Sequence, residues 1–536
     1  MKVKKALKQM ALWLTALSMA ITVVGCGEDS ETDPVGNKKE DATKAQLYVG
    51  VYNGGLGYKW ARKVADNFEE YYKDIEIGDK TGIQVTITPE EDINFNLKQI
   101  VASIKTGSQK NDVILSGAHY YDFIQEGVCA DITEYLNEPV YDANGALVDE
   151  SYTGQKYTLL DRMDDYFVDS YKIEDKYYGF PFEDCIAGLV YDVDLFEAKG
   201  WTVPQTMGEF YTLLNKMTNA RVTPFVTNNL TFYWNILHSI IIAQYEGIDN
   251  AMMNFTFEGV MDSAIVDGVE QQDVPITPEN AYLLHQQQGN YEALKFIKNI
   301  AKTSYVSGNS FNNSQTNYAA QQEYLDSIEY GKRIAMLLEG DWWENEARPT
   351  FNEWADTNPE YGYGERRFAF MPIPVMDGQK TEKQVMFGWS SGCAGFVPTT
   401  SKKKDLAALW IQFMHSRDSL AVFTTTTGSG LPYDYELTDT EYDSMTYFGQ
   451  SVYDMRRDPN VEILRTSKRC AMRRYVDSNS RFEGIDCDYM WGKLPFQYFY
   501  NNSNASVDDY WNSFLNYNIN TKTGWKTLYD NYLKVS

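Results

Sequence analysis

Aromatic side chains occur together with acidic or other hydrogen-bonding side chains in four stretches of the sequence. The residues concerned are Glu183 and Asp184 in "PFEDC", Trp234 in "NNLTFYWN", Asp341, Trp342 and Trp343 in "LLEGDWWENEA", and Trp389 and Ser390 in "FGWSSG". A pyranose ring has an apolar face that stacks on tryptophan, and its hydroxyl groups hydrogen-bond to carboxylates and amides. Core packing is the simpler explanation for any single tryptophan, but four such stretches at predicted strand-to-loop junctions favour sugar binding.

The Trp342–Trp343 doublet poses a packing problem. Adjacent residues of a helix or strand point in different directions, so one core cannot easily take both rings. "IAMLL" before the doublet has the pattern of a buried strand, and Asp341 and Glu344 have the spacing of a capping box that begins a helix. We therefore predict that one ring packs inside and the other faces a ligand, and the sequence leaves open which ring does which.

Catalytic and metal-binding motifs do not appear in the sequence. It contains no nucleophile elbow, phosphate-binding loop or dinucleotide fingerprint, and its four histidines are too scattered to suggest a metal site. Pairs such as Asp164–Asp165 or Glu183–Asp184 could supply the two carboxylates of a glycosidase. Because the chain has 75 acidic residues, such pairs arise by chance. We expect no catalytic residues, no metal and no cofactor, and a surface glycoside hydrolase remains the alternative function.

The N-terminal residues are typical of a secreted lipoprotein. Four lysines among the first eight residues precede a short apolar run, which ends in Val23-Val24-Gly25-Cys26. This ending resembles a bacterial lipobox, which predicts cleavage of a signal peptide (1–25) and a lipid on Cys26; the alternative is an ordinary signal peptide with a chance cysteine. Residues 26–45 are polar, as a flexible tether would be. We therefore expect attachment to the outer face of the bacterial cytoplasmic membrane.

Charge and cysteine content narrow the possible partners further. The 536 residues are enough for two or three packed units, and their net charge of −27 argues against nucleic acid as a partner. Six cysteines are present, so lipidation of one leaves an odd number and at least one free thiol. Cys129, Cys185 and Cys393 lie in apolar stretches and are predicted to be buried, whereas Cys470 and Cys487 are the one pair considered for a disulfide.

Hydrophobic periodicity predicts alternating strands and helices after the tether. Strands are expected near residues 46–52, 82–88 and 111–117, with helices near 58–72, 94–107 and 120–133. This order implies a parallel sheet with helices on both faces, and ligands bind such sheets at the carboxyl ends of the strands. The rule selects Asn53 after the first strand, and His119 and Tyr120 after the third.

The rest of the chain is expected to contain a second αβ region and a long helical end. That region begins near residue 156, and within it Thr206 and Glu209 have capping-box spacing before a helix. Residues 244–330 are expected to form mixed helical segments, 401–416 an amphipathic helix, and 433–536 mainly helices.

Three stretches, taken in order, resemble a known family. They are "YYGFPFEDCIAGLVYDVDLFEAKGWTVPQTMGEF", "GKRIAMLLEGDWW", and "FVPTTSKKKDLAALWIQFMHS" followed by "TGSGLP". The chain is similar over roughly residues 46–435 to bacterial extracellular solute-binding proteins of family 1, the carbohydrate-binding lipoproteins of ABC importers.

The resemblance implies an α/β, two-lobed periplasmic-binding-protein-like fold, in which each lobe is a sheet flanked by helices and a hinge joins the lobes. Lobe I would comprise 46–155 and 390–432, and lobe II 156–389 and 433–536. A sugar would bind in the cleft, stacked on Trp342 or Trp343, with His119, Tyr120 and Trp389 nearby.

The implied function is that of a non-catalytic, monomeric receptor that hands an oligosaccharide to the membrane permease subunits. A receptor for a peptide or another non-sugar solute is the third possibility.

Overall fold

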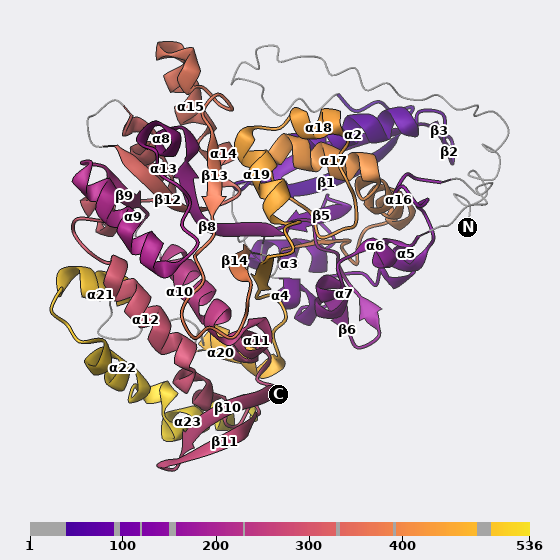
Figure 1. Cartoon of the computed structure of the whole chain (residues 1–536). Coiled ribbons are helices and arrows are strands. Elements are labelled where there is room, and N and C mark those ends of the chain that lie inside the picture. Colours follow the sequence, from indigo (N-terminus) through magenta and orange to yellow (C-terminus); the bar gives the residue numbers. More distant parts are fainter. Residues whose placement is uncertain are drawn as a thin grey trace. The chain divides into compact units, whose positions relative to one another are not determined.

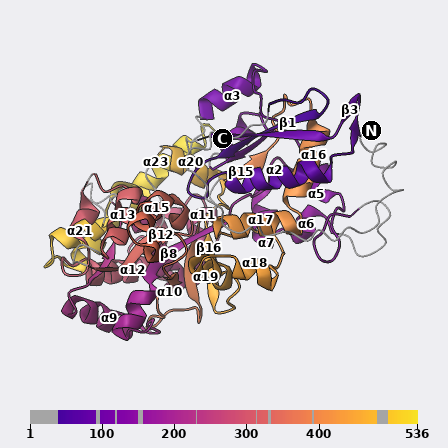
Figure 2. The same cartoon turned by 90° about the horizontal axis from the view of Figure 1, so that it is seen from above.

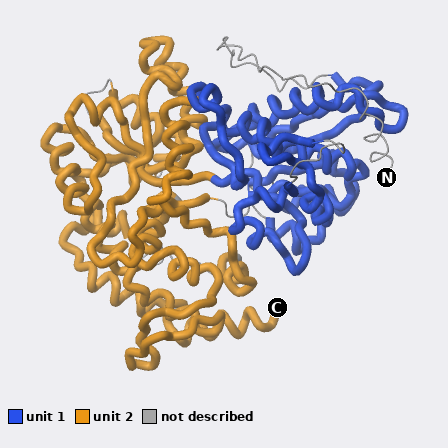
Figure 3. Tube along the Cα trace, turned by 45° about the vertical axis from the view of Figure 1, so that its right-hand side comes forward, with its two compact units in different colours: residues 1–184, 392–444 blue, residues 185–391, 445–536 orange. Residues whose placement is uncertain are grey.

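The chain forms two αβ units, each assembled from two separate segments (Figure 3). The computed structural model describes residues 39–90, 97–117, 120–148, 157–228, 231–312, 314–328, 333–389, 393–479 and 495–535. Unit 1 comprises the described parts of 1–184 and 392–444, and unit 2 those of 185–391 and 445–536. The chain therefore passes from one unit to the other three times.

Unit 1 contains a four-stranded sheet in the order β15-β5-β1-β4. Strand β1 runs parallel to both β4 and β5, and β15 closes the edge antiparallel to β5. The elements are β1 (Ala45–Tyr52), α2 (Lys59–Tyr71), β2 (Glu76–Ile77), β3 (Lys80–Thr81), β4 (Ile83–Glu90), α3 (Leu97–Lys105), β5 (Val113–Ser116), α4 (Tyr120–Gln125), α5 (Thr133–Asn137), α6 (Leu159–Arg162), α7 (Asp165–Tyr171), β6 (Lys172–Ile173), β7 (Lys176–Tyr177), β15 (Ala394–Phe396), α16 (Lys404–Met414), α17 (Arg417–Thr427) and α18 (Asp439–Asp443). The predicted parallel sheet is confirmed here.

Helix α2 shows how sequence periodicity positions a helix in unit 1. Trp60, Val64 and Phe68 recur every four residues and are buried, so they form one apolar stripe. The ring of Trp60 contacts Phe423 of α17, and that of Phe68 contacts Trp410 of α16. Figure 2 shows α2 lying along the sheet beside these late helices.

Unit 2 is built on a mixed sheet in the order β16-β14-β8-β12-β9, with β13 also paired to β8. Strand β8 is antiparallel to β12, β13 and β14, whereas β12 is parallel to β9. The elements before residue 330 are β8 (Cys185–Asp192), α8 (Val193–Lys199), α9 (Met207–Asn219), β9 (Thr223–Val226), α10 (Thr231–Glu246), α11 (Ile248–Thr256), β10 (Gly259–Val266), β11 (Val269–Ile276), η1 (Ala281–Gln286), α12 (Gln288–Ile300), η2 (Gly308–Phe311) and α13 (Asn317–Asp326). Those after it are β12 (Ile334–Gly340), α14 (Trp343–Glu346), α15 (Arg348–Thr357), η3 (Pro359–Tyr361), β13 (Phe368–Met371), β14 (Gln384–Trp389), α19 (Tyr447–Met455), β16 (Val461–Arg465), α20 (Ala471–Asn479), α21 (Pro495–Asn501), α22 (Val507–Leu515), η4 (Asn518–Asn520) and α23 (Lys522–Tyr532).

A β-hairpin occupies part of the region predicted to be helical. Strands β10 and β11 pair antiparallel and are joined by Asp267 and Gly268, both with positive φ (51° and 82°). An Asp-Gly pair in this conformation forms the tight turn that suits the twist of a hairpin. The hairpin packs with α11, α20 and α23 around the buried Trp525, and Figure 1 shows it beside α23. Strand β16 likewise interrupts the predicted helical end.

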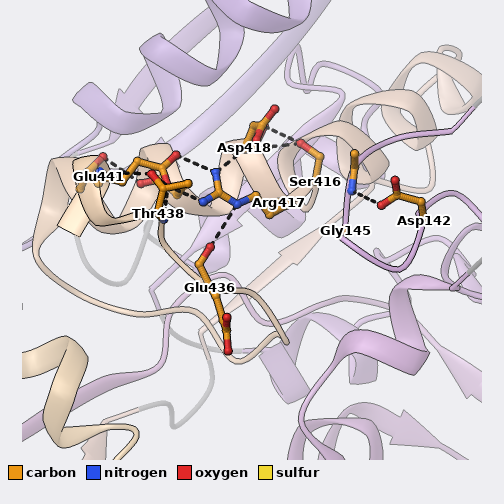
Figure 4. A network of polar contacts seen from close by, with 12 residues as sticks. Asp142, Gly145, Ser416, Arg417, Asp418, Glu436, Thr438 and Glu441 are labelled. Atoms are coloured by element: carbon orange, nitrogen blue, oxygen red, sulfur yellow. Dashed lines mark hydrogen bonds and ion pairs between the residues drawn. The ribbon is translucent and has the colours of Figure 1, made fainter. Parts of the chain in front are cut away.

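Two segments that the sequence assigned to lobe II belong to unit 1. Residues 157–184 are held there because the Tyr171 hydroxyl donates to the carbonyl of Cys393 and Phe180 pairs with Gly395. Residues 433–444 are held by Arg417, whose guanidinium binds the Glu441 carboxylate and donates to the Glu436 carbonyl at 3.1 Å (Figure 4).

The predicted capping box at Thr206 and Glu209 is confirmed at the start of α9. Cys129, Cys185 and Cys393 are buried free thiols, as predicted. Cys470 is half-buried, and Cys487 lies outside the described residues, so their pairing stays a prediction. In the part of the chain that the structure describes, no helix is both long and apolar enough to cross a membrane.

Candidate ligand-binding site

The carboxyl ends of three strands of unit 2 meet at one edge of its sheet. Strands β9 and β12 are parallel, with Val226 opposite Leu337. Strand β8 runs the other way, so its first residue, Cys185, lies opposite Trp389 at the end of β14. The residues that follow β9 and β12 are therefore at the same edge as Trp389, where ligands bind in open αβ sheets.

The two tryptophans of the doublet have different environments. Trp343 is 0 % exposed and lies in the main core of unit 2, edge-on to Phe368 at 5.0 Å and to Phe448 at 5.6 Å between ring centroids. Trp342 keeps 8 % of its surface exposed, and its ring lies over Gly340. A Cβ at residue 340 would come within 2.3–2.4 Å of three ring atoms, so this arrangement requires glycine there. Trp343 is thus the packing ring, and Trp342 is the one at the edge of the strand.

Trp342 belongs to a hydrogen-bonded chain of polar side chains. Its side chain hydrogen-bonds to Tyr233, which in turn hydrogen-bonds to Glu339. Because an indole N–H can only donate and a carboxylate can only accept, the Tyr233 hydroxyl accepts from Trp342 and donates to Glu339. The Gln321 amide donates to Glu339 Oε1 at 3.1 Å and to Glu346 Oε2 at 2.7 Å.

Burial perturbs three carboxyl groups beside the doublet. It raises the pKa of Glu339 well above its usual range, and the neighbouring charge of Glu346 raises it further. Burial also raises the pKa of Glu346, against hydrogen bonds from Gln321 and Asn317 that lower it. The pKa of Glu344 is raised to about 7, again by burial. Such shifts are common at functional sites, although buried structural groups show them too.

The predicted capping box at Asp341 and Glu344 is wrong. Helix α14 begins at Trp343 without a side-chain cap. The Asp341 carboxylate instead accepts from the backbone N–H of Ile186 at 3.1 Å, and that of Glu344 accepts from the Thr446 hydroxyl at 2.6 Å. Both carboxylates therefore bond to partners on other elements rather than to each other's backbone, and they tie α14 and the residue before Trp342 to the rest of unit 2.

The remaining predicted residues of unit 2 lie apart from this chain of side chains or beyond the described part. Trp234 is buried in α10, stacked at 5.4 Å on Phe311, so it serves the interior. Trp389 is half-buried at the end of β14. Ser390 lies outside the described residues.

The predicted residues of unit 1 are distributed between the sheet edge and the interior. Asn53 is half-buried directly after β1, and its backbone N–H donates to the Glu90 carbonyl at 2.7 Å. Tyr120 is 1 % exposed, and its hydroxyl donates to the Tyr171 carbonyl at 3.1 Å. His119 lies outside the described residues.

Glu183 and Asp184 are also buried. One oxygen of Glu183 accepts from the Cys393 thiol at 3.4 Å.

Sequence reasoning missed Tyr233, Gln321 and Glu346 as parts of the site. Tyr233 directly precedes Trp234, which was predicted. Adjacent residues of a helix point in different directions, so the side chain of Tyr233, and not that of Trp234, lies at the edge of β12. Gln321 is brought in from α13 by tertiary packing, and no local signal marks it. Among the described residues, no cluster of three or more His, Cys, Asp or Glu could hold a metal ion.

A hollow of about 470 Å³ lies within unit 1. It is lined in part by Asp142, Arg162 and Arg417. Both guanidinium groups are already bonded, to backbone carbonyls or to Glu441, which assigns them a structural role. The edge of β12 is therefore the better candidate for ligand binding.

The sequence profile described as "Bacterial extracellular solute-binding protein" matches residues 63–441. The chain belongs to this family, as the resemblance predicted. A search of curated protein sequences finds no significant match.

Solved structures of sugar-binding proteins have the same fold. The apo-form of RafE from Streptococcus pneumoniae is similar with a TM-score of 0.56 and 12% identity over 92% of this chain and 100% of that one. A chitin oligosaccharide binding protein is similar with a TM-score of 0.56 and 12% identity over 91% and 100%. The Thermus thermophilus maltotriose binding protein, bound with maltotriose, gives a TM-score of 0.52 and 16% identity over 90% and 99%. The predicted α/β substrate-binding-protein fold is confirmed.

Proposed function

We propose that this chain is the substrate-binding protein of an ABC importer and captures uncharged oligosaccharides. The observation that carries the proposal is Trp342, which lies at the carboxyl edge of β12 within a hydrogen-bonded chain of polar side chains. A ring for stacking next to fixed donors and acceptors is what a sugar requires. Similar folds in RafE, crystallised in complex with raffinose, and in a maltotriose-bound protein support carbohydrate as the ligand class.

In this proposal, Trp342 supplies the main stacking surface and Trp389 a second one at the same sheet edge. Asn53, His119, Glu183, Asp184, Asp341 and Ser390 would supply hydrogen bonds. Tyr120, Trp234 and Trp343 are better explained by packing. Ligand would favour a closed arrangement of the two units about the three chain crossings, and that arrangement would dock on the permease subunits. The protein would act as a monomer, anchored through a lipid on Cys26 and without catalysis.

Calorimetry of residues 27–536 against a panel of neutral oligosaccharides tests this function. We expect saturable binding with at least one sugar, and the sugar should be recovered intact by chromatography. Trp342→Ala should weaken binding by roughly 30-fold, or about 2 kcal/mol, because it removes a central aromatic contact.

The matched control is Trp354→Ala in α15 of the same unit. The indole N–H of Trp354 donates to Asp326 at 2.8 Å, away from the edge of β12, so this change should leave the affinity unaltered. Equal affinities of Trp342→Ala and the parent would refute the stacking role. Release of shorter sugars would favour a surface glycoside hydrolase, and binding of peptides but not sugars would favour a non-sugar receptor.

A further inference from the structure

Two carboxyl groups, one fully buried and one half-buried, are held together beside Trp342. Glu339 is 0 % exposed near the end of β12, and Glu346 closes the short helix α14. One nitrogen, Gln321 Nε2, donates to both, at 3.1 Å and 2.7 Å. Since a single amide nitrogen reaches both groups, their accepting oxygens must be close neighbours.

Among the described residues, the groups that act on this pair supply hydrogen bonds but no positive charge. From α10 comes Tyr233, and from α13 come Gln321, Asn317 and Tyr318. The second oxygen of Glu339 accepts from the backbone N–H of Gly340 at 2.9 Å. In the described ranges of the chain, no ion pair involves Glu339 or Glu346. Two adjacent carboxylates without a counter-charge, one of them fully buried, are costly to ionise together, which favours retention of one proton.

The pair is linked to Trp342 through one tyrosine. The Tyr233 hydroxyl donates to Glu339 and accepts from the Trp342 indole N–H. Because the ring also lies over Gly340, the indole has both its face and its nitrogen defined by the protein. The charge state of Glu339 therefore acts on the hydrogen bond that orients the indole.

We propose that Glu339 and Glu346 hold one proton between them at neutral pH and, through Tyr233, position the ring of Trp342 for its ligand. These are positioning residues, and the inference rests on the stacking role given to Trp342 above.

The sign of the pH dependence follows from the shared proton. Raising the pH removes it and leaves two adjacent negative charges, which disrupt the network. Sugar affinity should therefore be constant while the pair holds its proton and should fall above the apparent pKa of the pair, by up to about tenfold per pH unit. The apparent pKa belongs to the pair rather than to either residue.

The decisive measurement needs no ligand. The indole of Trp342 is observed by NMR in protein labelled with 15N-tryptophan and assigned by its loss in Trp342→Phe. In the parent, the Trp342 indole N–H resonance should shift with pH as the pair ionises. Glu339→Gln preserves an acceptor for Tyr233 and Gln321 but cannot ionise, so the resonance should lose its pH dependence and sugar affinity should become independent of pH.

Two further variants make the assignment specific. Tyr233→Phe breaks the link, so the Trp342 resonance should no longer follow the pair. Glu344→Gln is the matched control, because Glu344 is also a buried glutamate beside the doublet but bonds to Thr446, and its removal should leave the titration of Trp342 intact. Glu346→Gln replaces Glu339→Gln if circular dichroism shows that the latter does not fold.

Each outcome decides the proposal. A Trp342 resonance that does not move with pH, or that titrates unchanged in both Glu339→Gln and Tyr233→Phe, overturns it. A resonance that titrates as described in a protein that binds no sugar upholds the network and refutes the proposed function instead.

Discussion

At the scale of single residues, adjacent side chains in the Trp342–Glu346 segment have separate tasks. Trp343 fills the aromatic core, whereas Trp342 lies over Gly340 at the strand edge. The Glu344 carboxylate accepts a hydrogen bond from the hydroxyl of Thr446, the residue just before α19. Single substitutions can therefore separate the proposed binding role of Trp342 from the contribution of this segment to stability.

Glu344→Gln should stabilise the protein in a pH-dependent way. Burial raises the pKa of Glu344 from 4.5 to about 7, so the ionised carboxylate is disfavoured in the folded state. Its contribution to stability is fully present below pH 4.5 and is lost as the pH rises to about 7. Glutamine can still accept from Thr446, so urea unfolding should give equal stabilities near pH 4 and a more stable variant near pH 8. An equal difference at both pH values would contradict this explanation.

The candidate site was only partly predictable from the sequence. The buried strand β12 before the doublet and the packing of one of its two rings in the core followed from strand pattern and residue type. The identity of the packing ring did not, because it depends on Phe368 and Phe448, which lie far away in sequence. Tyr233, Gln321 and Glu346 are likewise selected by contacts between helices and strands, which no local pattern records.

At the scale of elements, Asp192 joins three parts of unit 2. Its carboxylate caps α8 by accepting from the Leu195 N–H at 2.9 Å. It also binds Arg333, just before β12, and Arg366, just before β13. Asp192 is fully buried, so these contacts fix the ends of a helix and two strands from one point.

Asp192→Asn should destabilise unit 2 strongly. The amide can still cap α8 but leaves two arginines without their counter-charge, which typically costs about 3–5 kcal/mol. Asp194→Asn is the control, because Asp194 forms a more exposed pair with Arg367 whose loss should cost at most about 1 kcal/mol. Urea unfolding of the parent and both variants measures the difference, and equal effects would show that the buried charges are not the cause.

The strands β1, β4 and β5 and the helices α2, α3 and α16 of unit 1 were predicted because period-2 and period-3.6 patterns are clear there. The hairpin of β10 and β11 was not, although Asp267-Gly268 is a recognisable turn, because most residues of the two strands are exposed and give only a weak apolar pattern. The boundaries between units were displaced since ion pairs and backbone bonds, such as those of Arg417, decide them.

At the scale of the whole molecule, the family assignment implies an extracellular location, and the proposed anchor adds attachment to a membrane. Expressed at full length in a bacterium, the parent should incorporate radiolabelled palmitate and sediment with membranes. Cys26→Ala should lose the label and be released, because the lipid is attached to that sulfur. Cys470→Ala, which removes a half-buried thiol, should keep both properties. A labelled Cys26→Ala protein would contradict the anchor.

Because segments distant in sequence pack together, each unit can be completed only late in synthesis. The sheet of unit 1 needs β15, and the apolar stripe of α2 packs on α16 and α17, all of which are made only after most of unit 2. The small core beneath the hairpin needs Trp525, which contacts Phe257 at 5.5 Å between ring centroids. Synthesis must therefore reach residue 444 before unit 1 has all its parts, and it must pass Trp525 before unit 2 has all of its own. A polypeptide that stays incomplete for so long during synthesis is well suited to crossing a membrane as an extended chain and to folding on the far side.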